Sequence, residues 1–227
     1  MCGRFALLTS GDSLLSSFEV DTTPLDLSQL GPRYNIAPTQ PVLAVRTTAV
    51  SDQRELTLFR WGLIPSWAKD MKMGARMINA RSETVAEKPA FRSAFKRRRC
   101  LIPADGFYEW QKQNGGKQPL YIRLRDERPF ALAGLWEIWQ SPGGDELETC
   151  TILTTTPNEL MEPIHNRMPV LLHPDDYDEW LHPGASPQTA LHLLRPYPAE
   201  EMEAYPVSPH VNSPTNDDPA CIAPIAA

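Results

Sequence analysis

The chain has 227 residues, 41% of them hydrophobic, which is enough for a substantial core in one large domain or two small ones. Its 23 prolines and 12 glycines favour turns and irregular connections over long helices. No apolar run approaches the ~18–20 residues of a membrane span, and no charged-then-apolar signal peptide is visible. We therefore expect a cytoplasmic protein that makes no membrane contact.

The net charge of −6 argues against a nucleic-acid-binding protein, but the charge is unevenly distributed. Residues 1–100 contain 15 Lys and Arg against 9 Asp and Glu, a net charge of +6, whereas the remainder contains 7 against 19, a net charge of −12. Phosphate contacts need a local cationic face rather than a cationic whole. The basic run at residues 96–99 is either part of such a face or a solvated run at the end of a helix.

Short strands dominate the predicted secondary structure. A helix is expected over residues 12–18, where Leu14, Leu15 and Phe18 lie on one side, and a loop over residues 21–40. Further helical pieces are expected around Val85 and at residues 91–96, 158–161, 175–181 and 187–194. A hairpin turn is expected at residues 114–116, and strands at 42–46, 56–63, 100–103, 106–111, 120–124, 130–138, 150–156 and 205–208.

These elements show neither βαβ alternation nor an internal repeat. We therefore predict the α+β class, with a single domain over residues 1–227 built on a mostly antiparallel sheet. Residues 213–227 are expected to form a tail that is mobile or draped over the surface.

The four cysteines, Cys2, Cys100, Cys150 and Cys221, are far apart and form no C-x-x-C pair. This spacing argues against a zinc site of the usual kind, and a cytoplasmic setting argues against a disulfide framework. We expect no metal and no cofactor.

The first residues, Met1-Cys2-Gly3-Arg4, have distinctive chemistry. Methionine aminopeptidases remove Met1 when the second residue is small, so the expected mature N-terminus is Cys2. Its α-amine titrates near pH ~7.7–8.0 and its thiol near ~8.5, so neutral amine and thiolate are both available near neutral pH. The amine can form an imine with an aldehyde, which the thiol closes to a thiazolidine. The same thiol can instead be the nucleophile of an acyl transfer.

Other residues are candidates for proton transfer to and from Cys2 and for substrate binding. Glu109 lies in an apolar extended segment, where desolvation raises the pKa of a carboxyl group and suits it to proton transfer near neutral pH; the alternative is a half-exposed Glu paired with an Arg. His165, in a polar turn, fits a proton shuttle or a structural turn residue. Asn79 and Arg81, two apart on an extended segment, point to the same side, as an amide donor beside a guanidinium that binds phosphate or carboxylate.

Six motifs together resemble the SRAP family, the SOS response-associated peptidase domain proteins, also called abasic-site processing proteins. They occur in the family's order from residue 2 to about residue 212, and each alone would be weak. The motifs are MCGRF at residues 1–5, RYNIAP at 33–38, RWGLIP at 60–65 with Trp67, NARSET at 79–84, CLIPADGFYEW at 100–110 and HNRMP at 165–169.

The resemblance implies binding to single-stranded DNA at an abasic site and a thiazolidine link between Cys2 and the ring-opened deoxyribose aldehyde, which shields the lesion from strand breakage. By the same resemblance, Asn79 holds the sugar and the N-terminus. Glu109 is the acid and base for ring opening and imine formation, and His165 assists proton transfer and reversal. The abasic sugar is mainly a closed hemiacetal, so an acid/base group has to open it first.

The resemblance also implies DNA contacts and a fold. Arg4, Arg81 and Arg167 match phosphate-binding positions, and Trp67 resembles an aromatic residue that stacks at a kinked strand. The implied fold is a compact, mixed α+β domain with a curved sheet. We expect a monomer, and partners at the replication fork stay open.

Three other functions share some of these sequence features. An N-terminal-nucleophile glutamine amidotransferase also begins Met-Cys-Gly, but this chain continues with Arg4-Phe5 and lacks an Arg-Gly-Pro-Asp segment. A cysteine peptidase would use Cys2, Glu109 and His165, yet only Met1 precedes Cys2, so self-processing would release one residue. A non-covalent single-strand binder predicts that Cys2→Ala keeps full DNA retention under denaturing conditions.

Overall fold

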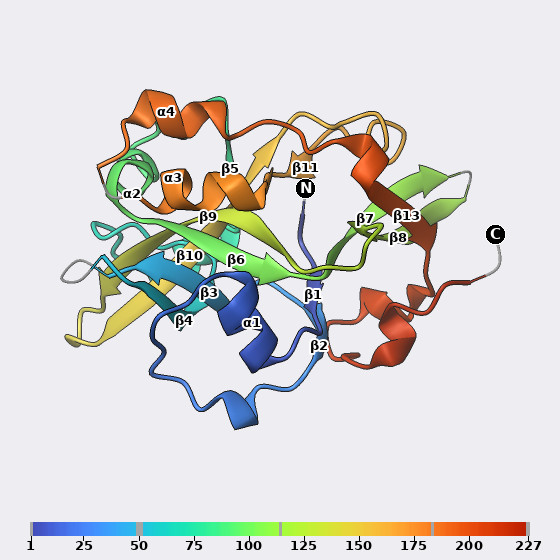
Figure 1. The fold of residues 1–227 in the computed structure, drawn as a ribbon, viewed down its shortest axis with the longest axis horizontal. Helices are drawn as coiled ribbons and strands as arrows, with labels where there is room; N and C mark the ends of the chain where they lie inside the picture. Colours follow the sequence, from blue (N-terminus) through green and yellow to red (C-terminus); the bar gives the residue numbers. More distant parts are fainter. Residues whose placement is uncertain (1, 49–51, 114, 183, 226–227) are drawn as a thin grey trace.

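A computed structural model describes residues 2–48, 52–113, 115–182 and 184–225, and its strands form two sheets (Figure 1). The first sheet has the order β13-β8-β7-β1-β2, and all its pairings are antiparallel. Its strands are β13 (Met202–Pro206), β8 (Gly116–Leu124), β7 (Gly106–Gln113), β1 (Phe5–Leu7) and β2 (Arg33–Ile36).

The second sheet, of order β11-β10-β4-β3-β6-β9-β12, closes into a small barrel because β10 also pairs with β9. Strand β10 runs parallel to β4 and to the short strand β5, and the other pairings are antiparallel. The strands are β11 (Met168–Pro169), β10 (Glu146–Thr155), β4 (Arg54–Trp61), β3 (Pro41–Thr47), β6 (Arg99–Ala104), β9 (Phe130–Gln140), β12 (Leu171–Leu172) and β5 (Asn79–Arg81). The predicted α+β class with a curved, mostly antiparallel sheet is confirmed.

One corner of the chain joins the two sheets. Strand β6 belongs to the barrel, and β7 follows in the first sheet after the single residue Asp105. The Asp105 carboxylate accepts hydrogen bonds from the backbone N–H groups of Leu8 and Thr9 and from the Thr9 hydroxyl. The end of β1 is therefore fixed to the point where the chain passes from the barrel to the first sheet.

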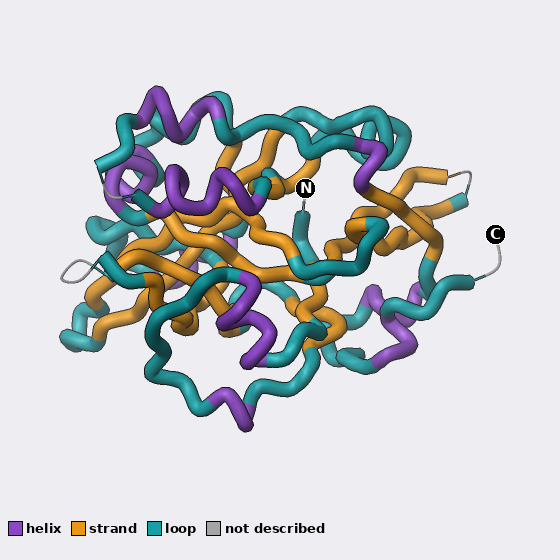
Figure 2. Tube along the Cα trace, viewed as in Figure 1, coloured by secondary structure: helices purple, strands orange, loops and turns teal. Residues whose placement is uncertain are grey.

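The helices are short and lie around the strands (Figure 2). They are α1 (Gly11–Ser17), α2 (Arg92–Arg97), α3 (Tyr177–Leu181) and α4 (Pro187–His192). Ser10 caps α1, and its hydroxyl accepts the N–H of Ser13. The predicted helix around Val85 is wrong. Residues 82–87 form turns, and Pro89, which has no N–H to donate, lies two residues after them.

Strand β2 corrects the loop expected over residues 21–40, because Arg33–Ile36 pairs with β1. The predicted hairpin connects β7 and β8, where Gln113 pairs with Gly116, but Asn114 lies outside the described residues. Residues 213–225 pack on the protein: Pro224 forms a bridge with Val207, and Cys221 is fully buried. Among the described residues, no helix has the length and apolar character to cross a membrane.

Candidate active site

Cys2 lies three residues before Phe5, the first residue of β1, which pairs with β2 on one side and with β7 on the other. The chain enters the middle of the molecule here, between β11 and β7 (Figure 1). Cys2 is 0% exposed, and its Sγ lies 3.8 Å from the Arg4 carbonyl oxygen, which accepts its hydrogen bond. Burial, followed by the negative charge of Glu109, raises the pKa of the Cys2 thiol well above its ordinary value. The thiol is therefore held in its protonated form at neutral pH.

Asn79 connects the barrel to the N-terminal segment. It is the first residue of β5 and pairs with Ile152 of β10, which fixes its backbone. Its Nδ2 donates to the Cys2 carbonyl oxygen at 2.8 Å. Its Oδ1 is buried and has no hydrogen-bond partner among the described residues. The amide thus orients the Cys2 backbone and keeps one acceptor available within the site.

Glu109 extends from β7 in the other sheet, opposite Leu120 of β8. It is 3% exposed, so its carboxyl group is buried in the protein. Its negative charge contributes to the raised pKa of the Cys2 thiol, so the two side chains interact electrostatically. A buried carboxyl group beside a protonated thiol can accept or deliver a proton without competition from bulk water.

His165 lies in the loop that leads to β11. Its Nδ1 lies 3.0 Å from the backbone nitrogen and 3.2 Å from the carbonyl oxygen of Arg167, so the backbone of residue 167 holds this side of the ring in either tautomer. The loop is tied to β7, because Gln111 Nε2 donates to the Pro163 carbonyl oxygen at 3.2 Å. The strand that carries Glu109 and the loop that carries His165 are therefore joined directly.

The four DNA-contact candidates have different surroundings. Trp67 is 57% exposed. Arg81 is exposed at the end of β5, and its side chain forms no hydrogen bond or ion pair with any described residue. Arg167 forms a two-pronged ion pair with Glu83, and its Nη2 also donates to the Thr154 carbonyl oxygen at 2.6 Å.

The Arg4 guanidinium donates hydrogen bonds to acceptors within the protein. Its Nη1 donates to Asn35 Oδ1 and to the Val211 carbonyl oxygen, both at 2.8 Å, and its Nη2 donates to the Asn212 carbonyl oxygen at 3.1 Å. Its guanidinium also lies over the Trp110 ring, 6.0 Å from the centroid. The bonds account for both terminal nitrogens, so the guanidinium holds the N-terminal segment against the C-terminal one.

A network around Asn35 completes this attachment. The buried Asn35 Nδ2 donates to the carbonyl oxygens of Val211, Ser213 and Asn216, at 2.7–3.1 Å. Asp217 accepts the backbone N–H of Asn35 at 3.0 Å. We call Arg4, Asn35 and residues 211–217 the terminal clamp. The clamp was not predicted from the sequence, although Asn35 lies inside the RYNIAP motif.

One cluster of potential metal ligands is present among the described residues, at His210, Asp218 and Cys221. His210 Nε2 pairs with Asp218 at 2.9 Å, and its Nδ1 faces the Asn216 side-chain amide at 3.1 Å. Both ring nitrogens are therefore engaged in hydrogen bonds, and the pair with His210 lowers the pKa of Asp218. This pattern fits a structural His–Asp pair.

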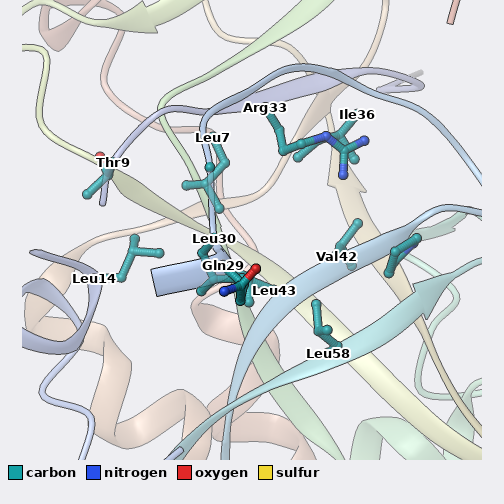
Figure 3. Close-up of a pocket in the computed structure, with 12 residues that line it drawn as sticks. Leu7, Thr9, Leu14, Gln29, Leu30, Arg33, Ile36, Val42, Leu43 and Leu58 are labelled. Atoms are coloured by element: carbon teal, nitrogen blue, oxygen red, sulfur yellow. The ribbon is translucent and has the colours of Figure 1, made fainter. Parts of the chain in front are cut away.

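An apolar cavity of about 210 Å³ lies beside α1 and β3, and none of the four candidate catalytic residues lines it (Figure 3). Its walls are Leu7, Thr9, Leu14, Gln29, Leu30, Gly31, Arg33, Ile36, Pro41, Val42, Leu43 and Leu58. The chemistry-bearing groups are gathered elsewhere, at the junction of the two sheets.

The sequence matches the family described as SOS response associated peptidase (SRAP) over residues 1–214. Abasic site processing protein YoqW of Bacillus subtilis (strain 168) is 48% identical over 224 residues, which cover 98% of this chain and 99% of that protein. Abasic site processing protein HMCES of Gallus gallus is 38% identical over 225 residues, which cover 86% of this chain and 66% of that protein.

A solved structure of a protein from Bacteroides thetaiotaomicron has the same fold. It aligns with a TM-score of 0.88 at 29% sequence identity, over 99% of this chain and 100% of that chain. The match in sequence and the match in fold both extend over nearly the whole chain. The protein therefore belongs to the SRAP family.

Proposed function

We propose that the protein captures abasic sites in single-stranded DNA by a covalent bond to Cys2 after Met1 has been removed. The observation that carries this proposal is the fixed position of Cys2, whose carbonyl oxygen accepts a hydrogen bond from Asn79 Nδ2 at 2.8 Å. The charge of the buried Glu109 carboxyl group, which acts on the pKa of the Cys2 thiol, agrees with it. The names of YoqW and HMCES, both abasic site processing proteins, agree with it.

The chemistry balances without an oxidant or a metal. The Cys2 α-amine adds to the sugar aldehyde, and the resulting carbinolamine loses one water to give an imine. The thiol sulfur then adds to the imine carbon and its proton passes to nitrogen, which closes a five-membered thiazolidine. Removal of Met1 is required, because a Cys2 nitrogen held in a peptide bond cannot form an imine.

Proton transfer is the part that the site supplies. The closed hemiacetal has to open before the amine can react, and this step moves a proton from the sugar hydroxyl to the ring oxygen. We assign that step and the loss of water to Glu109. The raised pKa of the Cys2 thiol means that its proton must be removed as sulfur attacks, and the nearby carboxylate is suited to accept it. His165, whose Nδ1 is held by the backbone of Arg167, is assigned to assist these transfers and the reverse reaction.

DNA contacts are assigned to the exposed groups around the site. Trp67 offers an aromatic face for stacking, and the unpaired Arg81 offers a guanidinium for a phosphate. Arg167 is assigned a phosphate contact that it makes alongside its ion pair with Glu83. Arg4 is left to the terminal clamp.

The test is a denaturing gel of the purified protein with a single-stranded oligonucleotide that carries one abasic site. The expected result is a shifted band that needs both the lesion and Cys2, and that forms far more slowly with Glu109→Gln. Cys2→Ser keeps the α-amine but not the thiol, so it should give a band only after borohydride reduction, whereas the wild-type band should survive without reduction.

An undamaged oligonucleotide and Cys2→Ala are the controls, and intact mass establishes that Met1 is absent. A wild-type protein that lacks Met1 and still gives no lesion-dependent band would sink the proposal. Glutamine and peptide substrates would then be tested instead.

A further inference from the structure

The basic run at residues 96–99 contains two kinds of side chain. Arg99 is 4% exposed, and its guanidinium donates to the carbonyl oxygens of Trp180 at 2.6 Å and Phe95 at 2.8 Å. Arg98 forms an ion pair with Glu137 at 2.6 Å. Both therefore stabilise the fold. Residues 96 and 97, in contrast, are exposed in the last turn of α2.

Four exposed cations gather on and before α2: Lys88, Arg92, Lys96 and Arg97, here called the α2 basic surface. Residues 86–97 contain these four and a single acid, Glu87, in a chain whose net charge is −6. Within the described ranges none of the four forms an ion pair, and the contact of Arg97 is a donated hydrogen bond to the Ser93 hydroxyl at 2.8 Å. The positive charge of the α2 basic surface is therefore exposed and has no carboxylate partner among the described residues.

The α2 basic surface is concave rather than flat. A hollow of about 370 Å³ opens between α2 and the start of α4, and Arg92, Lys96 and Arg97 line it. The lining contains no carboxylate, and it consists of Ala86, Arg92, Ser93, Phe95, Lys96, Arg97 and Pro187. A cationic hollow with an apolar floor fits a phosphate group or a run of phosphates.

The surface is connected to the candidate active site through the chain. Strand β5, which carries Asn79 and Arg81, leads through the turns at residues 82–87 into α2. In Figure 1, α2 lies at the opposite end of the molecule from the β7–β8 hairpin and β13. A strand of nucleic acid bound at α2 is therefore remote from that hairpin.

We infer that the α2 basic surface is a second contact for single-stranded DNA, through its phosphates and independent of the lesion. Lys and Arg without acidic partners attract a polyanion and release its counterions on binding. The only aromatic residue in the lining, Phe95, is 1% exposed, so no ring is available for base stacking. The contact should therefore be indifferent to base sequence and sensitive to salt.

This inference deepens the proposed function and rests on it for the identity of the partner, but it does not need the covalent step. The test measures binding of an undamaged oligothymidine of about 20 nucleotides, longer than the ~4–16 nucleotides of many single-strand sites, by fluorescence anisotropy at several salt concentrations. The variant is Lys96→Gln/Arg97→Gln. The matched control, Lys112→Gln/Lys117→Gln, removes the same charge from exposed positions on the β7–β8 hairpin.

If Lys96 and Arg97 each neutralise one phosphate, each contributes ~0.7 to the steepness of the plot of log K against log salt. The variant should therefore show a slope smaller in magnitude than that of the wild type by about 1.4, and its affinity at low salt should be lower by on the order of tenfold. The control should keep both values, and the crosslinking rate of the α2 variant at saturating lesion substrate should match wild type. Equal slopes for the α2 variant and the wild-type protein would overturn the inference, even if the crosslink forms normally. Binding of poly-glutamate, an acidic polypeptide, is measured in the same way. If the α2 variant loses poly-glutamate binding but keeps oligothymidine binding, the inference is also overturned and the surface is assigned to an acidic polypeptide. Loss of the crosslink with normal oligothymidine binding would count against the proposed function alone.

Discussion

The terminal clamp predicts a large cost for a single buried amide. Asn35 is 0% exposed. Its side chain accepts one hydrogen bond from Arg4 at 2.8 Å, and its two Nδ2 hydrogens are shared among the carbonyl oxygens of Val211, Ser213 and Asn216. At ~0.5–1.5 kcal/mol net for each of about three bonds, replacing Asn35 with Ala removes about 1.5–4.5 kcal/mol.

The remaining contacts narrow this range. Val211 keeps Arg4 as a donor, the Ser213 carbonyl oxygen keeps the backbone N–H of Asn216, and the Asn216 carbonyl oxygen keeps the Cys221 thiol. Because every partner retains another bond, we expect the lower part of the range, about 2–3 kcal/mol.

The assay is urea unfolding with linear extrapolation of the free energy. Asn212→Ala is the matched control, since Asn212 is exposed and its side chain accepts one bond, from Trp110 Nε1 at 2.7 Å. It should cost about 1 kcal/mol or less. If Asn35→Ala costs no more than the control, the terminal clamp does not hold the N-terminal segment, and the reasoning fails.

Three further predictions concern charge and space. The negative charge of Glu109 raises the pKa of the Cys2 thiol, and Glu109→Gln removes that charge. Iodoacetamide should therefore alkylate Cys2 faster in this variant than in the wild type, while crosslinking becomes slower. An unchanged alkylation rate would refute this prediction. Arg167 lowers the pKa of Glu83, so their pair stabilises the fold above pH ~4.3 and this stability is lost as pH falls through the folded pKa. Glu83 is 47% exposed, so the wild-type advantage over Glu83→Gln should be at most ~1 kcal/mol at pH 7 and absent in acid; thermal unfolding against pH tests this, and an advantage that persists in acid contradicts it. A Cβ on Gly106 would lie 2.2 Å from an aromatic carbon of β8, so Gly106→Ala should lower the unfolding free energy by about 2 kcal/mol or more, and an unchanged melting temperature would count against the packing.

The sequence allowed most elements to be predicted because their signals are local. Apolar spacing in residues 12–18 corresponds to α1, and alternation in residues 56–63 corresponds to β4. The closure of the barrel was not predicted, because it depends on β10 pairing with β9 and β4 at once, and no local pattern encodes a long-range register. Strand β2 was not predicted for the same reason, because Arg33–Ile36 shows no clear alternation of apolar and polar residues and is defined by its pairing with β1.

The candidate site shows the same division. Cys2 was identified from its own chemistry, but the contact between Asn79 and Cys2 joins residues from different sheets. Only the resemblance to a family, not the spacing, led to that expectation. Arg4 is matched to phosphate binding by the resemblance, and in the structure its guanidinium also donates to Asn35 and to the carbonyl oxygens of Val211 and Asn212, contacts that the motif did not indicate. A motif names the residue but not the partner that the tertiary fold supplies.

The terminal clamp also sets an order of events during synthesis. Arg4 and Asn35 leave the ribosome early, but their partners at residues 211–217 are among the last to emerge. At ~5–20 residues per second, a chain of this length spends roughly 10–45 s before the clamp can close. Cys2 is fully buried in the finished fold, so removal of Met1 within this interval frees the amine that the chemistry requires before Cys2 is packed into the core. Slow or absent processing of Met1 would leave a folded protein without a reactive N-terminus.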